Sequence, residues 1–224
     1  MRVAALVTGG KDSVLALYRA QKIGHDVEVL ATMIPKRADS YMFHFPNIHL
    51  TELLSRAVEI PLVKAETSGV KEKELEDLKN LLASLDVEGV VSGAVSSSYQ
   101  KERIERICHE LDLKSVTPLW HEDPYTLLKE MIDLKFKAII VGVYAYGFDK
   151  SWLGKEINSV TLDSLVELHD KYQVSLVGEG GEYESLVLDA PFFKKRIEIV
   201  QAETSYENLS GVLVVKEARL VDKD

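Results

Sequence analysis

Residues 3–18 read VAALVTGGKDSVLALY, and this stretch decides the fold of the chain. The apolar run at residues 3–7 has the length and composition of a buried parallel strand. The run breaks at residues 8–13, and apolar residues then recur at helical spacing over residues 14–18. A strand, a glycine turn and a helix start present backbone N–H groups to an anion, so the stretch predicts a phosphate-binding loop.

The turn between this strand and helix combines hydroxyl groups, glycines, a cation and a carboxylate, in the order Thr8, Gly9, Gly10, Lys11, Asp12 and Ser13. Glycine lets the backbone approach an anion without a Cβ in the way. A carboxylate repels a phosphate unless a divalent cation lies between them, so Asp12 is the candidate ligand of Mg²⁺. The loop is not a Walker A loop, because the pattern G-x-x-x-x-G-K-[ST] is absent. A plain turn capped by Ser13 fits the same residues.

Short apolar runs alternate with helical patterns in the first half of the chain. Strands are predicted at residues 27–33, 61–65 and 89–94, and helices at residues 48–59, 70–85 and 99–111. Strands that alternate with helices of about ten or more residues form a parallel sheet. The sequence therefore predicts an α/β fold with helices on both faces of the sheet and a ligand site beyond the carboxyl ends of the strands.

Further residues fall at that edge of the sheet. Gly93 ends the strand predicted at residues 89–94, and Gln100 and Arg103 lie about one turn apart at the start of the next helix. Arg103 can reach a ligand at this edge, or it can be an ordinary helix-surface arginine. We interpret residues 36–47 as a loop over the site, with a plain surface loop as the alternative.

The pattern changes in the second half. Helices are predicted at residues 123–134 and 161–172, and strands at residues 136–143, 174–177, 185–189, 197–202 and 212–218. No helical pattern follows Tyr172. We place a boundary at residues 119–122, which predicts a first domain at residues 1–120 and a smaller C-terminal α+β domain at residues 121–224.

A second motif, GEGGEYE, occupies residues 178–184 and joins three glycines to three carboxylates. A glycine-rich loop brings the backbone close to a ligand. Glu182 and Glu184 point the same way if the segment is extended, because side chains alternate along a strand. Such a pair can hold an ammonium group, a trimethylammonium group, a metal or a proton in transit. An acidic surface turn is the alternative.

The composition excludes several classes of protein. The chain has 224 residues, a formal net charge of -9 and one cysteine. Cys108 alone cannot form an intrachain disulfide or a CxxC pair, and it fits a reducing cytosol. No apolar run approaches the roughly 18 residues of a membrane span, and the N-terminus reads directly into a strand, so we expect neither a membrane segment nor a signal peptide. The acidic balance argues against direct binding of nucleic acid.

The first motif resembles the SGGKDS loop of the N-type ATP pyrophosphatases, the PP-loop family of the HUP class, with Thr8 in the place of the first serine. Those enzymes cleave ATP between the α and β phosphates. The second motif, with the residues that follow it, reads GEGGEYESLVLDAP and is similar to the EGGEYET-LVLDGP stretch of the diphthine–ammonia ligases, also called diphthamide synthases. Ser185 stands in the place of a threonine there, and Ala190 in the place of a glycine.

Three more segments resemble the same family in the same order. They are GAVSSSYQKERIE at residues 93–105, TPLWHED at residues 117–123 and GFDKSWLG at residues 147–154. The resemblance therefore covers most of the chain. It implies a HUP-type (Rossmann-like) sheet, an ATP-dependent ligase of the cytoplasm, and the last step of diphthamide formation, in which ammonium amidates diphthine on translation elongation factor 2.

The resemblance also implies roles for the residues. The carboxylate of diphthine is transferred to AMP as an acyl-adenylate, pyrophosphate leaves, and ammonia attacks the carbonyl group. Thr8, Gly9, Gly10, Lys11 and Ser13 hold the pyrophosphate and Asp12 holds Mg²⁺, while Gly93, Gln100 and Arg103 border the nucleotide. Glu182 and Glu184 bind ammonium or the diphthine cation. Lys11, Asp12 and these two glutamates are the candidate catalytic residues.

Two other functions stay open. A PP-loop enzyme that modifies tRNA shares the first motif, although thiolation needs more cysteines than Cys108 and a basic surface. A HUP module that binds a nucleotide without chemistry has little use for Asp12 in its phosphate loop. The oligomeric state, including a homo-oligomer, and the way in which the elongation factor docks stay open.

Overall fold

The protein, described by a computed structural model over residues 1–36, 46–68 and 70–223, has two sheets. Its first half contains β1 (Arg2–Leu6), α1 (Lys11–Lys22), β2 (Asp26–Pro35), η1 (Ile48–Leu50), α2 (Thr51–Val58), β3 (Leu62–Thr67), α3 (Lys71–Ala83), β4 (Gly89–Val91), α4 (Ser98–Glu110) and β5 (Lys114–Val116). Its second half contains α5 (Pro124–Asp133), β6 (Lys137–Val143), η2 (Lys150–Trp152), α6 (Ser159–Tyr172), β7 (Tyr183–Asp189), β8 (Lys195–Glu207) and β9 (Ser210–Asp222). The loop interpreted at residues 36–47 lies mostly outside the described residues.

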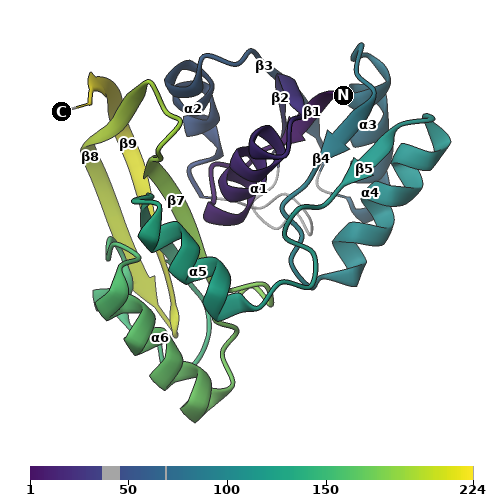
Figure 1. Ribbon diagram of the computed structural model, residues 1–224. Helices are drawn as coiled ribbons and strands as arrows, with labels where there is room; N and C mark the ends of the chain where they lie inside the picture. Colours follow the sequence, from purple (N-terminus) through teal and green to yellow (C-terminus); the bar gives the residue numbers. More distant parts are fainter. Residues whose placement is uncertain (37–45, 69, 224) are drawn as a thin grey trace.

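The first sheet is parallel, with the strand order β3-β2-β1-β4-β5 (Figure 1). One face packs against α1 and α2 through residues such as Val14 and Leu54, and the other packs against α3 and α4 through residues such as Leu78 and Ile107. Strands that are covered on both faces are apolar along their whole length, which explains the run at residues 3–7. The predicted α/β sheet with helices on both faces is confirmed.

The strand order reverses between β1 and β4. β2 and β3 lie on one side of β1, and β4 and β5 lie on the other. In an open parallel sheet, ligands bind at such a switch point, beyond the carboxyl ends of the strands. Residues 8–13 follow β1 and residues 92–95 follow β4, so both segments that the sequence assigned to the ligand edge lie at the switch point.

The second sheet is antiparallel, with the strand order β7-β6-β9-β8. The helices α5 and α6 lie along this sheet (Figure 1). In the same buried core as these helices, Tyr18 of α1 packs its ring against Phe136 and Phe192, at centroid distances of 5.9 and 5.7 Å. The buried core therefore runs from one half of the chain into the other, with α1 between them. The predicted C-terminal α+β region is confirmed.

Polar contacts also join the halves beside α1. Arg19 Nη1 donates to Pro118 O at 2.9 Å, and Arg19 Nε donates to Glu130 Oε1 on α5 at 3.3 Å. The first sheet ends at Val116 and the second begins at Lys137. The exact division of the chain near residue 120 stays a prediction. No helix in the described part of the chain is both long enough and apolar enough to cross a membrane.

Two strand assignments differ between the sequence and the structure. The strand predicted at residues 174–177 is wrong, because this segment is irregular. Its carbonyl groups contact side chains instead of a neighbouring strand: the Tyr183 hydroxyl donates to Leu176 O at 2.7 Å, and Lys11 Nζ donates to Val177 O. The edge strand β5 at Lys114–Val116 was not predicted, and a turn follows it at Pro118, which has no N–H group for a ladder.

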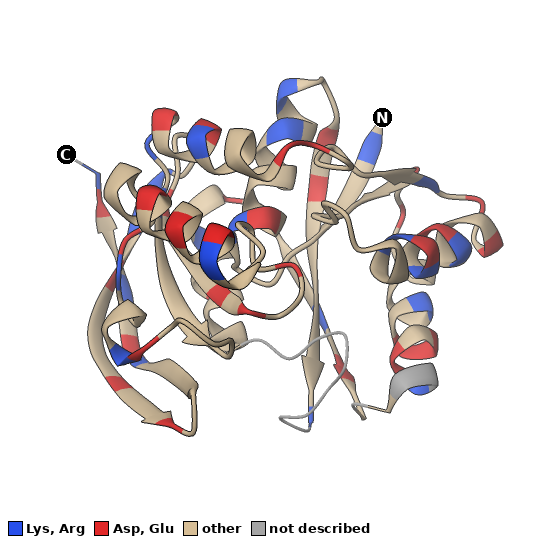
Figure 2. Ribbon diagram, turned by 90° about the horizontal axis from the view of Figure 1, so that it is seen from below, with Lys and Arg blue, Asp and Glu red and all other residues tan. Residues whose placement is uncertain are grey.

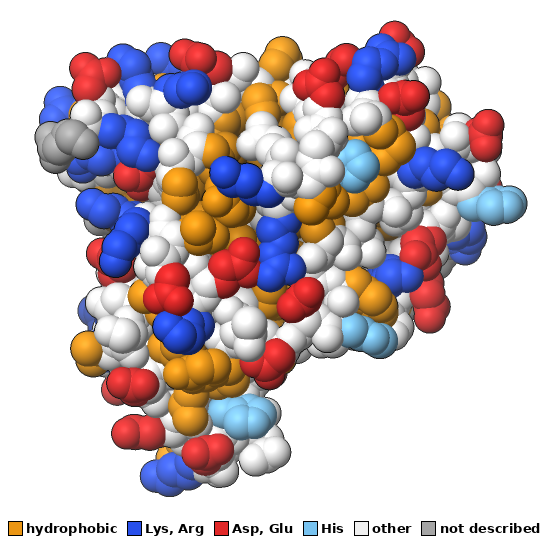
Figure 3. All heavy atoms as spheres, viewed as in Figure 1, with side chains coloured by type: hydrophobic (Ala, Val, Ile, Leu, Met, Phe, Trp, Pro, Cys, Tyr) orange, Lys and Arg blue, Asp and Glu red, His pale blue; other side chains and the backbone are white. Residues whose placement is uncertain are grey.

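The surface carries both signs of charge. Acidic and basic residues are interspersed along the outer helices in Figure 2. On the face seen in Figure 3, apolar side chains show in separate patches among charged side chains of both signs. The formal net charge of -9 is therefore spread over the molecule and is not the product of one acidic block.

Candidate active site

A cavity of about 600 Å³ opens at the switch point between β1 and β4. The first half of the chain lines it with the ends of β1, β2 and β4, the loop after β1 and the start of α4. The second half lines it with residues 177–181 and 183–185. The two motifs singled out in the sequence therefore face one cavity, although they lie at opposite ends of the chain.

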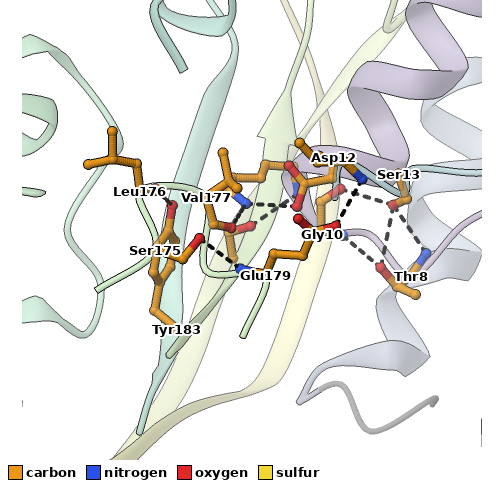
Figure 4. Close-up of polar contacts among 12 residues, drawn as sticks. Thr8, Gly10, Asp12, Ser13, Ser175, Leu176, Val177, Glu179 and Tyr183 are labelled. Atoms are coloured by element: carbon orange, nitrogen blue, oxygen red, sulfur yellow. Dashed lines mark hydrogen bonds and ion pairs between the residues drawn. The ribbon is translucent and has the colours of Figure 1, made fainter. Parts of the chain in front are cut away.

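The loop after β1 is braced by its own side chains (Figure 4). Thr8 N donates to Ser13 Oγ at 3.3 Å, Gly10 N donates to Thr8 Oγ1 at 3.3 Å, and Ser13 Oγ donates to Gly10 O at 3.0 Å. Gly9 has a φ of 86°, a conformation that favours glycine. The loop thus holds a fixed shape at the N-terminus of α1, where the helix dipole favours an anion.

Gly93 allows β4 to approach this loop. A Cβ at Gly93 would lie 2.8 Å from both the carbonyl carbon of Asp12 and the amide nitrogen of Ser13. Both atoms belong to the backbone of the first turn of α1 and cannot move aside cheaply. Any larger residue here would displace the helix start, so Gly93 is required by a close approach at the edge of the cavity.

The strand that follows the second motif is hydrogen-bonded to the phosphate loop. Lys11 N donates to Ser185 Oγ at 3.1 Å, and Val187 N donates to Gly9 O at 2.9 Å. Ser185 and Val187 are both on β7. Because β7 belongs to the second sheet, these bonds fix the position of the second half relative to the loop that would hold phosphate.

Lys11 and Asp12 form an ion pair within the phosphate loop, and Lys11 also contacts the residue just before the second motif. The Lys11 side chain is 3% exposed, and its Nζ donates to Asp12 Oδ2 at 2.7 Å and to Val177 O. Desolvation by the walls of the cavity raises the pKa of the Asp12 carboxyl, although 33% of the side chain is still exposed. The charge of Glu179 acts in the same direction, and the Lys11 ammonium opposes both. A further cation beside Asp12 would therefore be favourable, which fits the predicted Mg²⁺ ligand.

Glu184 and Glu182 do not share the cavity. Glu184 lines it, and its Oε2 is buried without a hydrogen-bond partner among the described residues. Burial raises the pKa of the Glu184 carboxyl to about 8, against a smaller opposing effect of the Tyr144 hydroxyl beside it. Glu182 is outside the lining, and its Oε1 accepts a hydrogen bond from Ser175 N at 3.0 Å within its own loop.

Of Gln100 and Arg103, only Gln100 lines the cavity. Gln100 lines the cavity at the start of α4. The Arg103 guanidinium lies 3.3 Å from the ring centroid of Tyr99, and its Nη1 donates to Tyr99 O at 3.1 Å, so Arg103 turns back onto its own helix. Arg103 is outside the lining and meets the cavity only through Tyr99, which is part of its wall.

Sequence reasoning missed several residues of the site. Ser92, 3% exposed, lines the cavity at the end of β4, and its hydroxyl has no hydrogen-bond partner within the described ranges. Tyr144 lies beside Glu184, and nothing in the sequence marked it. Glu179 was visible as the first carboxylate of the second motif, but no role was assigned to it.

The cavity suits a nucleotide. One wall is apolar, formed by Leu6, Ala31, Met33 and Ile104, and can take a base. The lining also contains the N-terminus of α1 and the hydroxyl groups of Thr8 and Ser13. It further contains the Ser92 hydroxyl, which has no hydrogen-bond partner among the described residues. All of these are groups that bind phosphate. Its volume of about 600 Å³ is within the usual range for ligands of this size.

Comparison with known families covers both halves of the chain. Residues 1–115 match the family described as "Diphthamide synthase N-terminal domain", and residues 123–221 match "Diphthamide synthase C-terminal domain". A Bos taurus protein named "Diphthine--ammonia ligase" is 38% identical over 226 residues, which cover 91% of this chain and 84% of the relative.

Two further comparisons cover much of the chain. A Schizosaccharomyces pombe "Diphthine--ammonia ligase" is 34% identical over the whole chain, but the chain spans 40% of that relative's length. A solved structure, titled a predicted subunit of tRNA methyltransferase from Methanocaldococcus jannaschii, is 14% identical, with a TM-score of 0.45 over 85% of this chain and 98% of that chain.

Proposed function

Because the chain belongs to the diphthamide synthase family, we propose that it is a diphthine–ammonia ligase, which uses ATP and ammonium to amidate the carboxylate of diphthine on translation elongation factor 2. The observation that carries the proposal is the cavity that the phosphate loop and the acidic glycine loop line together. One loop suits ATP, and the other offers a buried carboxylate for a cation. A ligase that joins an activated acid to ammonium needs both.

The reaction needs activation because a carboxylate is a poor electrophile. Its charge repels a nucleophile, and oxide is a poor leaving group. In the proposed scheme the diphthine carboxylate attacks the α-phosphorus of ATP, which gives an acyl-adenylate and pyrophosphate. Ammonia then attacks the carbonyl carbon, the bond to AMP breaks, and the products are the amide, AMP and a proton. The low-dielectric cavity strengthens each electrostatic contact with the developing charges.

The phosphate loop is the proposed pyrophosphate site. Thr8, Gly9, Gly10 and Ser13 surround the N-terminus of α1, whose dipole favours the charge that develops on the leaving group. Lys11 supplies a buried positive charge beside them. Asp12 would hold Mg²⁺, and the ion would supply neutralisation of phosphate charge.

The nucleotide would lie between this loop and the apolar wall. Gly93 and Gln100 border the space at the ends of β4 and α4. Arg103 would act through Tyr99, because its guanidinium covers the ring of that residue. A stacked arginine fixes the orientation of an aromatic side chain that itself borders the cavity.

Glu184 is the proposed cation site. Glu184 Oε2 is buried without a hydrogen-bond partner among the described residues, and such a carboxylate gains more from a bound cation than a solvated one does. Ammonium has no free electron pair, so a group beside it must take a proton before ammonia can attack. Glu184 has a pKa suited to that exchange near neutral pH. Glu182 would keep the loop in shape through the Ser175 amide.

The alternatives fit less well. The net charge of -9 and the mixture of charges in Figure 2 give little support to a tRNA-modifying enzyme, which needs clustered basic residues. A binding module without chemistry would not need Glu184 beside the phosphate loop. We place the reaction in the cytoplasm, where a free thiol such as Cys108 stays reduced.

Cys108 provides a test against thiolation chemistry. Its side chain is 1% exposed on α4, and burial raises the pKa of the thiol to about 11, so it is not a nucleophile at neutral pH. We expect Cys108→Ser to keep its amidation rate and to lose about 1–3 kcal/mol of stability, because a hydroxyl group replaces a buried thiol. Amidation rates and thermal melts check this. A folded Cys108→Ser protein without activity would favour the thiolation alternative.

The proposal is tested by reconstitution. The purified chain is incubated with diphthine-bearing elongation factor 2, ATP, Mg²⁺ and ammonium, and the modified histidine is analysed by mass spectrometry. We expect conversion of the carboxylate to the amide, with no conversion when ATP or ammonium is omitted. An unchanged histidine with all components present would contradict the proposal.

A further inference from the structure

Glu179 connects the two halves of the chain across the cavity. It lies in the loop between α6 and β7, and its Oε1 accepts hydrogen bonds from Val95 N at 2.9 Å, Ser96 N at 2.6 Å and Ser97 N at 2.7 Å. Its Oε2 accepts from Ser96 N at 2.7 Å and from the Ser96 hydroxyl. All of these donors belong to the segment between β4 and α4, in the first half of the chain.

The donors form an anion site that the protein fills itself. Ser97 is the N-cap of α4, so the helix dipole adds to the three amides. Burial works against the ionised carboxylate of Glu179. The hydroxyl and amide of Ser96 and the amides of Ser97 and Val95 outweigh it, so the pKa of Glu179 lies below its ordinary value. Glu179 therefore stays ionised and bound at neutral pH.

The loop that Glu179 anchors is one side of the cavity. Residues 178–181 line it, and Gly181 N donates to Gly178 O at 3.0 Å to close a tight turn. Just before the turn, Val177 O accepts a hydrogen bond from Lys11 Nζ. An anchor at Glu179 thus holds the glycine turn over the cavity and keeps a carbonyl group against the ammonium of the phosphate loop.

We propose that Glu179 is a positioning residue, which ties the loop at residues 178–181 to the N-terminus of α4 and so holds that loop against a bound nucleotide. The nucleotide part of this inference rests on the proposed function. Glu179 is not needed to hold the two halves together, because the shared core, the contact of Arg19 with Glu130 and the bonds between β7 and the phosphate loop also join them. Its loss should therefore loosen one loop and leave the fold intact.

The test compares Glu179→Ala with Glu130→Ala, which removes the carboxylate of another contact between the halves. Hydrogen exchange is measured on the full chain without ligand. In Glu179→Ala we expect at least about tenfold faster exchange at the amides of residues 95–97 and 178–181, because local opening is no longer opposed. In Glu130→Ala these amides should exchange as in the wild type. Unchanged exchange in Glu179→Ala would contradict the claim that Glu179 holds residues 178–181 to the N-terminus of α4.

Calorimetry with ATP and Mg²⁺ tests the positioning role. We expect roughly tenfold weaker ATP binding in Glu179→Ala and an intermediate loss in Glu179→Gln, which keeps an acceptor oxygen but no charge. Wild-type affinity in Glu179→Ala, with faster loop exchange, would reduce Glu179 to a structural contact and overturn the proposal. Failure of the wild type to bind ATP would count against the proposed function. The exchange measurement needs no ligand, so it would still show whether Glu179 links its loop to residues 95–97.

Added acetate distinguishes a link between the loop and α4 from a negative charge that only occupies the amide site. Acetate can refill the amide site in Glu179→Ala, but it cannot reconnect the loop to α4. We expect no recovery of ATP affinity with acetate, compared with chloride at the same ionic strength. Recovery would mean that an anion at residues 95–97 is sufficient, and it would overturn the positioning role.

Discussion

Glu184→Gln is expected to lower the amidation rate at least about a hundredfold and to raise thermal stability at alkaline pH. The carboxylate lines the cavity, and its Oε2 is buried without a hydrogen-bond partner in the part of the chain that the structure describes. A glutamine keeps the size of the side chain but can neither balance a cation nor accept its proton. ATP affinity should stay close to that of the wild type, because Glu184 lies on β7 and not in the phosphate loop.

The pH dependence of the rate follows from the same group. Burial holds the pKa of Glu184 at about 8, so the ionised fraction grows as pH rises through that value. We therefore expect the wild-type rate, at ammonium concentrations below saturation, to rise between about pH 7 and 9. In Glu184→Gln the part of this rise that depends on Glu184 should disappear, and only the rise that follows from the growing fraction of free ammonia should remain. A rate profile that is the same in both proteins would remove Glu184 from the chemistry.

The stability effect has the opposite sign to the usual loss on mutation. The folded pKa of about 8 lies above the ordinary value of 4.5, so between these values the folded protein binds a proton that the unfolded chain has released. Stability then falls as pH rises through this window, by up to about 1.4 kcal/mol per pH unit. Glutamine has no such proton, so we expect Glu184→Gln to melt at least about 5 °C above the wild type at pH 9, and with no difference near pH 4.5.

Glu182→Gln is the matched comparison. It makes the same chemical change two residues earlier, but Glu182 is outside the cavity lining and contacts the Ser175 amide. We expect a far smaller loss of amidation and no gain in melting temperature at pH 9. Equal losses in the two variants would mean that the pair acts together, as the sequence alone suggested.

Asp12→Ala is expected to lower turnover by at least about a hundredfold, because a bound metal supplies several kcal/mol of charge stabilisation. Asp12 lies on the first turn of α1, at the edge of the cavity, beside the phosphate loop. The Lys11 ammonium would lose its carboxylate partner in this variant and keep the Val177 carbonyl group. The fold should survive, because Asp12 itself is one-third exposed, at 33%.

Asp12→Asn is the control for this loss of pairing. It keeps an oxygen for Lys11 but removes the charge that would bind Mg²⁺. We expect a rate nearly as low as that of Asp12→Ala, with a higher Mg²⁺ concentration required for half-maximal turnover. Near-normal turnover with an unchanged Mg²⁺ dependence would show that Asp12 is only a turn residue.

Local patterns predicted the first half of the fold well. The glycine turn after residues 3–7 and the alternation of strands and helices depend on neighbours in the sequence, which periodicity reports directly. The strand predicted at residues 174–177 failed because the carbonyl groups of Leu176 and Val177 accept hydrogen bonds from Tyr183 and Lys11. Those partners lie elsewhere in the chain, and no local pattern contains them.

The sequence indicated which loops form the candidate site but not which way their side chains point. Glycines and carboxylates marked the two loops, but the direction of each side chain depends on packing between the halves. Arg103 turned to Tyr99, and Glu182 turned to Ser175, although their spacing allowed both to face the ligand. The need for Gly93 arises from the first turn of α1, which only the folded chain brings to within 2.8 Å of its Cβ position.

The most direct test of the central claim is the identity of the nucleotide product. The chain is supplied with diphthine-bearing elongation factor 2, ammonium, ATP and Mg²⁺, and the nucleotides are separated by chromatography while the amide is counted by mass spectrometry. The account predicts that, over many turnovers, AMP and pyrophosphate form in equal amounts with one amide for each, and that this turnover requires both ammonium and the protein substrate. ADP as the main product, or AMP formed without amide, would contradict it.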